Sequence, residues 1–329
     1  MMHPETTSTT EGERLGWGSA LVAALAGILT WLFVLFRTWQ AEIPFGLIDA
    51  LFLLAPTAIV PLGLRLAARS GGEGWGRKLL HAAIRLQPVA TLLVAASYGF
   101  PTGVTAGACS IGWVLLTALA GLAGCFRLRA LDRDRAGQSA GLMLLPVGGA
   151  GLFVSRYGLS PSGYEEPLIL LAAVHFHYAG FAAPLIADAV GEAIGRSSIW
   201  ARRLWVAATI GIVAGTPLVA AGFVLHLPVL KLVASTVLMA SLGTLSMLTL
   251  IRGARARPLI SQALLAVSSG TVLVGMILAG IYAVGEYMDV ATIDIPTMAV
   301  THGLLNGLGF SLCGLLGWLL PARNRGGLK

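Results

Sequence analysis

The sequence has few charged residues, and it lacks any polar segment long enough to form a separate soluble domain. Charged residues make up 11% of the 329 positions, hydrophobic residues make up 56%, and the mean hydropathy is +0.82. Soluble domains carry about 25% charged residues. A soluble chain of this size also has too little interior to bury so much apolar surface. We therefore expect the lipid bilayer to surround most of the chain.

Several chemical motifs are also missing. The three cysteines, Cys109, Cys125 and Cys313, lie far apart, and no Cys/His spacing typical of a zinc site occurs. The sequence has no GxSxG elbow, HExxH helix, dinucleotide fingerprint or haem-attachment motif. The loop at 71–78 resembles a phosphate loop but lacks its Lys-Ser/Thr ending. These absences leave cofactor and metal unknown, and they argue against ATP-driven transport by this chain alone.

Ten apolar runs predict membrane-spanning helices, because each has about 17–25 residues. They lie near residues 17–36, 46–64, 79–98, 106–126, 140–156, 166–187, 204–225, 229–251, 259–282 and 297–320. The fifth run is the weakest, since it is short and contains Pro146. We expect an all-α, polytopic transmembrane bundle of about ten helices. A polar N-terminus at 1–16 precedes a single transmembrane domain at 17–320, and a basic tail follows at 321–329.

The basic residues alternate between the two sides of the predicted bundle. Of the 22 Lys and Arg residues, 18 fall in the two ends of the chain and in every second loop. The opposite loops contain only Arg37, Arg156 and Lys231. Because cytoplasmic loops are enriched in Lys and Arg, this split predicts that both termini are cytoplasmic. The net charge of +7 then reflects topology, and we expect a lipid bilayer and no nucleic acid as partner.

Ionisable side chains inside the predicted helices are the candidate functional residues, because a charged group at mid-membrane costs about 2.5–3.5 kcal/mol. Helix six contains His175 and His177 near the bilayer centre, followed by Tyr178. On a regular helix the two histidines point in nearly opposite directions. If both rings were bonded to backbone carbonyls with no cavity beside them, a packing role would be favoured instead.

Glu166, His177 and Asp188 are spaced by 11 residues each, which is close to three turns of a regular helix. The pattern predicts a proton or cation path along helix six. The alternative is that Glu166 and Asp188 are ordinary residues at helix ends.

Two other helices contain polar pairs at i,i+4, which share one helix face. In helix ten, His302 and Asn306 form either part of a central site with His175 or His177, or an interhelical hydrogen bond. In helix three, His81 and Arg85 extend the predicted path toward the cytoplasmic side. Arg85 either reaches the membrane surface, binds an anion, or pairs with Asp188.

Two sequence runs resemble the YndJ-like bacterial membrane proteins. They are His175-Phe-His-Tyr-Ala-Gly-Phe181 and Thr301-His-Gly-Leu-Leu-Asn-Gly-Leu-Gly-Phe310. The resemblance covers predicted helices four to ten best. It implies a multi-pass protein of the bacterial inner membrane and supplies no substrate. It directs attention to the polar residues of the two runs, which are His175, His177, Tyr178, His302 and Asn306.

The leading hypothesis is a proton-coupled transporter of a small molecule or ion, because imidazoles titrate near neutral pH. The alternative is a membrane-embedded enzyme acting on a lipophilic substrate. Its histidines would bind a metal or haem, or act as general acid and base in an isomerase or cyclase. A sensor or assembly partner without turnover is a third option. The sequence leaves substrate, coupling ion and oligomeric state open.

Overall fold

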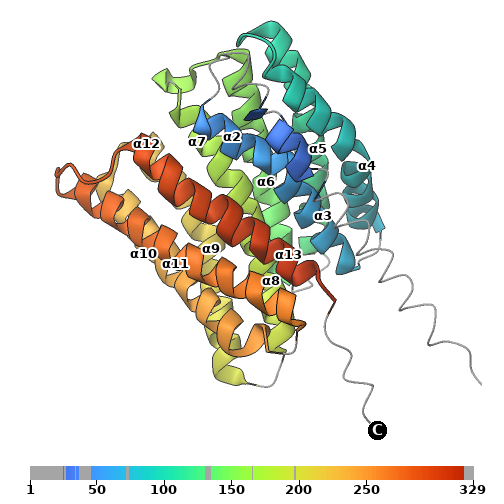
Figure 1. The fold of residues 1–329 in the computed structure, drawn as a ribbon, viewed down its shortest axis with the longest axis vertical. Helices are drawn as coiled ribbons and strands as arrows, with labels where there is room; N and C mark the ends of the chain where they lie inside the picture. Colours follow the sequence, from blue (N-terminus) through green and yellow to red (C-terminus); the bar gives the residue numbers. More distant parts are fainter. Residues whose placement is uncertain are drawn as a thin grey trace, which may run out of the picture.

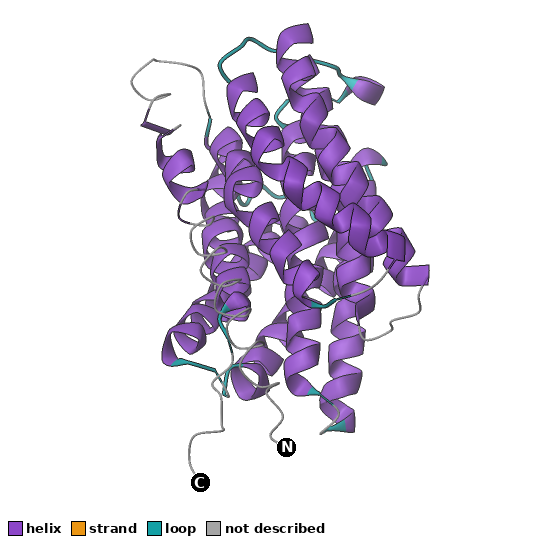
Figure 2. Ribbon diagram, turned by 90° about the vertical axis from the view of Figure 1, so that its right-hand side faces the viewer, coloured by secondary structure: helices purple, strands orange, loops and turns teal. Residues whose placement is uncertain are grey.

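The computed structural model describes residues 25, 27–33, 35–36, 46–71, 74–129, 135–164, 166–195, 198–255 and 257–321. Within these ranges the regular secondary structure is helical and contains no strand (Figure 2). Nine helices of this part are long and apolar enough to cross a membrane: Ile48–Arg69, Gly74–Ser97, Val104–Arg129, Ala136–Tyr157, Leu168–Ile194, Ile199–Val224, Pro228–Gly253, Leu259–Tyr287 and Ile295–Leu319. They match the second to tenth predicted helices. The predicted all-α polytopic fold is confirmed, whereas most of the first predicted helix, at 17–36, lies outside the described residues.

Two groups of consecutive helices flank the centre of the bundle (Figure 1). The first group contains α4 (Gly74–Ser97), α5 (Val104–Arg129) and α6 (Ala136–Tyr157). The second contains α9 (Ile199–Val224), α10 (Pro228–Leu248) and α11 (Leu259–Tyr287).

The second and sixth predicted helices lie between these groups. Their most apolar windows are 94% and 72% buried, which places them in the interior of the bundle. Each consists of three successive elements. The second is α2 (Leu47–Leu54), η1 (Ala55–Ile59) and α3 (Val60–Arg69); the sixth is α7 (Leu168–His175), η4 (Phe176–Ala182) and α8 (Ala183–Ile194).

The tenth predicted helix packs on α11 and contains four elements. They are α12 (Ile295–Met298), η6 (Ala299–Gly303), η7 (Leu305–Leu312) and α13 (Cys313–Leu319). Its start is capped, because the Asp294 carboxylate accepts the N–H of Thr297 at 2.8 Å. Hydrogen bonds from the side chain and the backbone N–H of Thr297 hold the pKa of Asp294 below its usual value.

The elements marked η1, η4, η6 and η7 are π-helical, with wider turns than an α-helix. Proline explains two of them: Pro56 lies inside η1, and Pro184 follows η4 directly. Proline has no N–H, and its ring clashes with the carbonyl four residues earlier. A wider turn removes that clash, and π-helical turns occur frequently at functional sites. Helix six is therefore not the regular helix that the 11-residue spacing assumes.

The fifth predicted helix is longer than expected. Residues 140–156 were the weakest prediction, yet α6 runs for 22 residues despite Pro146. It ends at Gly158, which adopts the left-handed conformation at φ 79°.

The two ends of the bundle differ in charge. One end, called the acidic end, carries the loop and helix-end residues Glu166, Glu286, Asp289 and Asp294. The other, called the basic end, carries Arg69, Arg77, Lys78, Arg129, Arg203 and Arg255.

Two cations at the acidic end have structural partners. Arg156 donates to the carbonyls of Ser97 and Phe100, both at 2.9 Å. Lys231 pairs with Glu286. These two exceptions to the charge alternation thus have a packing explanation, and the cytoplasmic placement of both termini stays a prediction.

A half-buried guanidinium binds the end of helix ten at the basic end. Arg257 donates to the carbonyl of Leu320 at 2.8 Å, and lies 4.4 Å from the centre of the Trp318 ring. Burial, with a smaller contribution from Arg69, lowers the pKa of Arg257 to about 10. The side chain therefore remains charged at neutral pH.

Candidate functional site

The two sequence runs that resemble a family meet inside the bundle. Tyr178, in η4, is buried and donates its hydroxyl proton to the carbonyl of Leu51 at 2.7 Å. A Cβ placed on Gly307, in η7, would lie 3.4 Å from the Leu51 side chain and 3.6 Å from the Tyr178 ring. The π-helical part of helix six thus touches helix two and helix ten at one place.

His177 is sealed in the protein, with 0% of its surface exposed. The indole N–H of Trp113, in α5, lies 3.0 Å from Nε2, and Nδ1 lies 2.7 Å from the carbonyl of Ala173. An indole N–H can only donate, so Nε2 accepts and Nδ1 carries the proton. The neutral ring uses both nitrogens, and a second proton on Nε2 would face the Trp113 N–H. This geometry favours a packing role for His177.

His175 and His302 are half-buried. His175 Nε2 lies 3.2 Å from the carbonyl of Thr216 in α9, and His302 Nδ1 lies 2.8 Å from the carbonyl of Gly275 in α11. Each ring therefore donates one N–H to a backbone carbonyl. The other ring nitrogen of each makes no hydrogen bond to any residue that the structure describes, so it remains available as an acceptor.

These two histidines lie at a similar depth in the bundle. Each is seven residues after the first residue of its helix, Leu168 or Ile295, which is about 10 Å below the acidic end. No hydrogen bond joins His302 to His175 or His177 in the described part of the chain, and the bond from His302 to the Gly275 carbonyl of α11 fits the interhelical alternative.

Asn306 supports His302 on the side that faces α11. Its amide donates to the carbonyl of His302 at 2.8 Å, and a Cβ on Gly275 would lie only 2.7 Å from the Asn306 amide nitrogen. The i,i+4 pair is therefore held together as predicted, and its neighbour is α11.

Glu166 and Asp188 cap helices. Glu166 lies in the turn before α7, is exposed, and accepts the N–H of Leu170 at 3.3 Å. Asp188, buried in α8, accepts the N–H of Gln138 at 2.6 Å in the first turn of α6. A carboxylate at a helix start satisfies free N–H groups and the helix dipole. With η4 interrupting the helix between them, the predicted stripe lacks its geometric basis. Glu166 lies at a helix end as the alternative predicts, whereas Asp188 lies inside α8 and caps the neighbouring helix α6.

His81 and Arg85 are exposed on α4. Arg85 does not pair with Asp188 in the structure. The neighbouring Gln87 instead donates to the hydroxyl oxygen of Thr91 at 2.9 Å, and Thr91 donates to the carbonyl of Pro56 at 2.9 Å. The polar residues of α4 that reach the interior, Gln87 and Thr91, thus supply hydrogen bonds to the π-helical turn of helix two.

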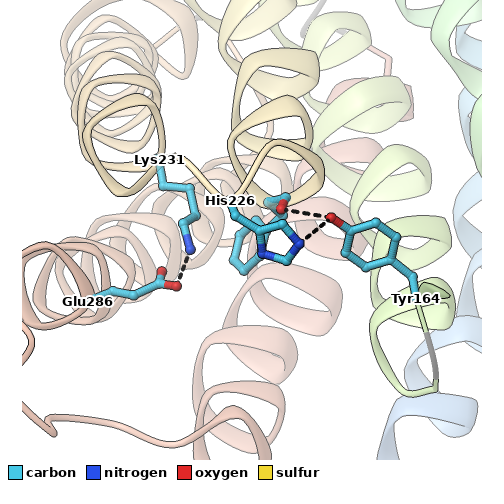
Figure 3. A network of polar contacts seen from close by, with 5 residues as sticks. Tyr164, His226, Lys231 and Glu286 are labelled. Atoms are coloured by element: carbon cyan, nitrogen blue, oxygen red, sulfur yellow. Dashed lines mark hydrogen bonds and ion pairs between the residues drawn. The ribbon is translucent and has the colours of Figure 1, made fainter. Parts of the chain in front are cut away.

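A polar stripe leads from His302 to the acidic end. On α11, Tyr282 and Glu286 lie 7 and 11 residues after Gly275. Because α11 is a regular α-helix, the three positions share one face. At its end Glu286 pairs with Lys231, whose ammonium lies 4.6 Å from the centre of the Phe223 ring. Figure 3 shows this pair facing each other across α10 and α11.

A second polar contact lies beside the ion pair in Figure 3. The Tyr164 hydroxyl donates to the carbonyl of Val224 at 2.6 Å and lies 2.9 Å from Nε2 of His226. The two rings are stacked, with planes 14° apart. This contact ties the loop before α7 to the turn between α9 and α10.

Sequence reasoning missed most partners of these histidines. Thr216 and Gly275 contribute backbone carbonyls, which carry no residue-type signal. Trp113 had a signal, because it lies well inside the predicted helix 106–126 instead of at a membrane interface, and a buried indole N–H needs an acceptor. Lys231 had one as well, as a rare cation among the acidic loops.

The described residues offer no cluster of three or more His, Cys, Asp or Glu side chains arranged to hold a metal ion. Among these residues, the histidines of helices six and ten have no further protein ligands of the kind that complete a typical zinc site.

Comparison with known proteins places the chain. The family model described as YndJ-like protein matches residues 50–310. A curated relative, "Uncharacterized membrane protein YndJ" of Bacillus subtilis (strain 168), is 25% identical over 283 residues. That alignment covers 84% of this chain but only 50% of the relative, so the chain spans about half its length. No solved structure matches. Both motif runs lie within the matched region, and the chain is a multi-pass membrane protein of the YndJ-like family.

Proposed function

We propose that this chain is a proton-coupled transporter of a small molecule or ion, located in the bacterial inner membrane with both termini in the cytoplasm. The observation that carries the proposal is the pair His175 and His302. Both are half-buried at similar depth, and each keeps one ring nitrogen unengaged by the described residues. Imidazoles in a membrane are functional candidates by default, and these two each keep one ring nitrogen that can accept a proton or a hydrogen bond from a solute.

The route from the acidic end runs along the α11 stripe. Glu286 and Lys231 lie at the entrance, Tyr282 lies one turn deeper, and Gly275 marks the level of His302. A second positive charge at the same depth in a low-dielectric region is unfavourable, so the two histidines would together take up one proton more readily than two. Such a pair couples one proton to one binding event.

The π-helical turns of helices two, six and ten supply the moving part. Those of helices six and ten meet at Tyr178 and Gly307, beside Leu51 of α2, and a π-helical turn could revert to an α-helical one by shifting a register of hydrogen bonds. That shift would rotate His175, at the boundary of α7 and η4, relative to His302. His177 stays fixed against Trp113 as the pivot.

The test is proton flux in proteoliposomes after a pH jump. His302→Ala and His175→Ala are each expected to reduce proton-coupled flux by about tenfold or more, the loss typical when a positioned proton-transfer group is removed. His81→Ala, on the exposed face of α4, is expected to leave flux within about twofold of wild type. Flux that survives in both histidine variants, or is lost in His81→Ala, would overturn the route.

A membrane enzyme is the second candidate, because the same unengaged nitrogens suit a general acid and base. The donor set of the described residues favours acid–base chemistry, such as isomerisation, over a metal-dependent step. Conversion of a lipophilic substrate by purified protein without a transmembrane gradient would select this candidate. Flux that depends on the pH gradient would select the transporter.

A further inference from the structure

A lipid-facing groove lies between α10 and α11, away from the histidines. Its volume is about 490 Å³, within the range of about 300–1,000 Å³ typical of small-molecule sites. It is lined by Leu232, Thr236, Met239, Ile277, Gly280, Ile281, Val284, Gly285, Met288, Val290 and Thr292. Only two of these side chains carry a hydroxyl, and none belongs to the candidate site. The groove therefore takes an apolar ligand unrelated to the proposed chemistry.

The groove extends through one leaflet. It runs from Ile277 on α11 to Met288, just past the end of that helix. Eleven residues of α-helix are about 16 Å long, roughly half of the 30 Å hydrocarbon core. Beyond Met288, Val290 and Thr292 continue its lining into the loop at the acidic end.

Glycine creates the hollow. A Cβ on Gly280 would have Met239 Sδ as its nearest neighbour, at 3.5 Å, so the space beside it is open to the bilayer. At Gly285 the Thr292 side chain occupies the corresponding place, because a Cβ there would lie 2.4 Å from its hydroxyl oxygen. The groove is thus closed at the acidic end and open along its side.

The size of the groove selects its occupant. A helix about 10 Å wide and 16 Å long occupies on the order of 1,200 Å³, so only some of its side chains could enter a groove of about 490 Å³. A single hydrocarbon chain is narrow enough to follow the groove, and burying each methylene contributes about 0.8 kcal/mol. We infer that this groove binds one acyl chain of a phospholipid from the leaflet at the acidic end.

The test is native mass spectrometry of the full chain in detergent, with a defined phosphatidylethanolamine added. Gly280→Leu fills the groove, and it is expected to weaken retention of one phospholipid by about tenfold or more, since excluding about two methylenes has that effect. Ile277→Trp fills the same groove from an exposed position and serves if Gly280→Leu fails to fold. The matched control is Gly270→Leu on the same helix, where a Cβ would meet nothing within 4 Å.

Retention is expected to fall in the groove variants and to stay unchanged in the control. Equal retention in Gly280→Leu and Gly270→Leu would overturn the inference. A dimer of this chain that dissociates in Gly280→Leu, without loss of phospholipid, would also overturn it and would assign the groove to a second copy.

Discussion

Replacing Trp113 with phenylalanine is expected to lower the free energy of unfolding by about 1–3 kcal/mol, because Nε2 of His177 would lose its donor inside the protein. His177 is 0% exposed, so water cannot replace the indole N–H. His177→Ala is expected to cost about 3 kcal/mol or more, since it leaves both a cavity and an unpaired Trp113 N–H. Thermal unfolding of the purified protein in detergent measures both changes.

The control for this prediction is Trp200→Phe, at a tryptophan that is 70% exposed, where a change within about 0.5 kcal/mol is expected. Combining Trp113→Phe with His177→Leu removes both polar groups. The double variant is expected to lose less stability than the sum of the losses in Trp113→Phe and His177→Leu measured singly. An unchanged melting temperature in His177→Ala, accompanied by loss of proton flux, would contradict the packing role and return His177 to the proton path.

Glu286→Gln is expected to destabilise the protein more than Lys231→Met, although both break the same ion pair. The Lys231 side chain is 9% exposed and the Glu286 side chain is 31% exposed. Removing Glu286 leaves a buried ammonium with the Phe223 ring as its neighbour, at a cost of about 3 kcal/mol. Removing Lys231 leaves a carboxylate whose Oε2 is buried without a partner, but the Glu286 side chain is 31% exposed and can turn toward water, so we expect a smaller cost of about 1–2 kcal/mol.

The double variant Lys231→Met/Glu286→Gln is expected to recover most of the loss, because no unpaired charge remains buried. Lys78→Met, at an exposed lysine of the basic end, controls for loss of charge alone and is expected to change stability by less than about 0.5 kcal/mol. Equal effects of the two single variants in thermal unfolding would show that solvent access does not decide the strength of this pair.

Composition and periodicity predicted most of the architecture. A helix must satisfy its own backbone in lipid, so a run of about 20 apolar residues is nearly sufficient to specify a spanning segment. This holds even for 140–156, where Pro146 weakened the prediction but α6 is complete. A proline inside a buried helix is tolerated when neighbouring groups satisfy the carbonyl that loses its N–H partner. The sequence of one helix does not show whether such neighbours are present.

The candidate site was predicted less well. The sequence shows which ionisable side chains lie inside the membrane, but it does not show which groups they hydrogen-bond to. The sequence treated His175 and His177 alike, yet one keeps a free nitrogen and the other is enclosed by Trp113 and Ala173. The 11-residue spacing of Glu166, His177 and Asp188 indicates a path only on a regular helix, and η4 interrupts that helix. In the structure Glu166 and Asp188 accept backbone N–H groups at helix starts.

The sequence alone determined the spanning segments, the charge alternation and the two histidine-containing runs. These depend on local composition, because the lipid bilayer permits few backbone structures other than helices. The tertiary structure decided which carbonyl or indole each imidazole meets, where the helices widen around Pro56 and Pro184, and that Lys231 finds Glu286. Such contacts join residues tens of positions apart, and they depend on how neighbouring helices are rotated, which no single segment encodes.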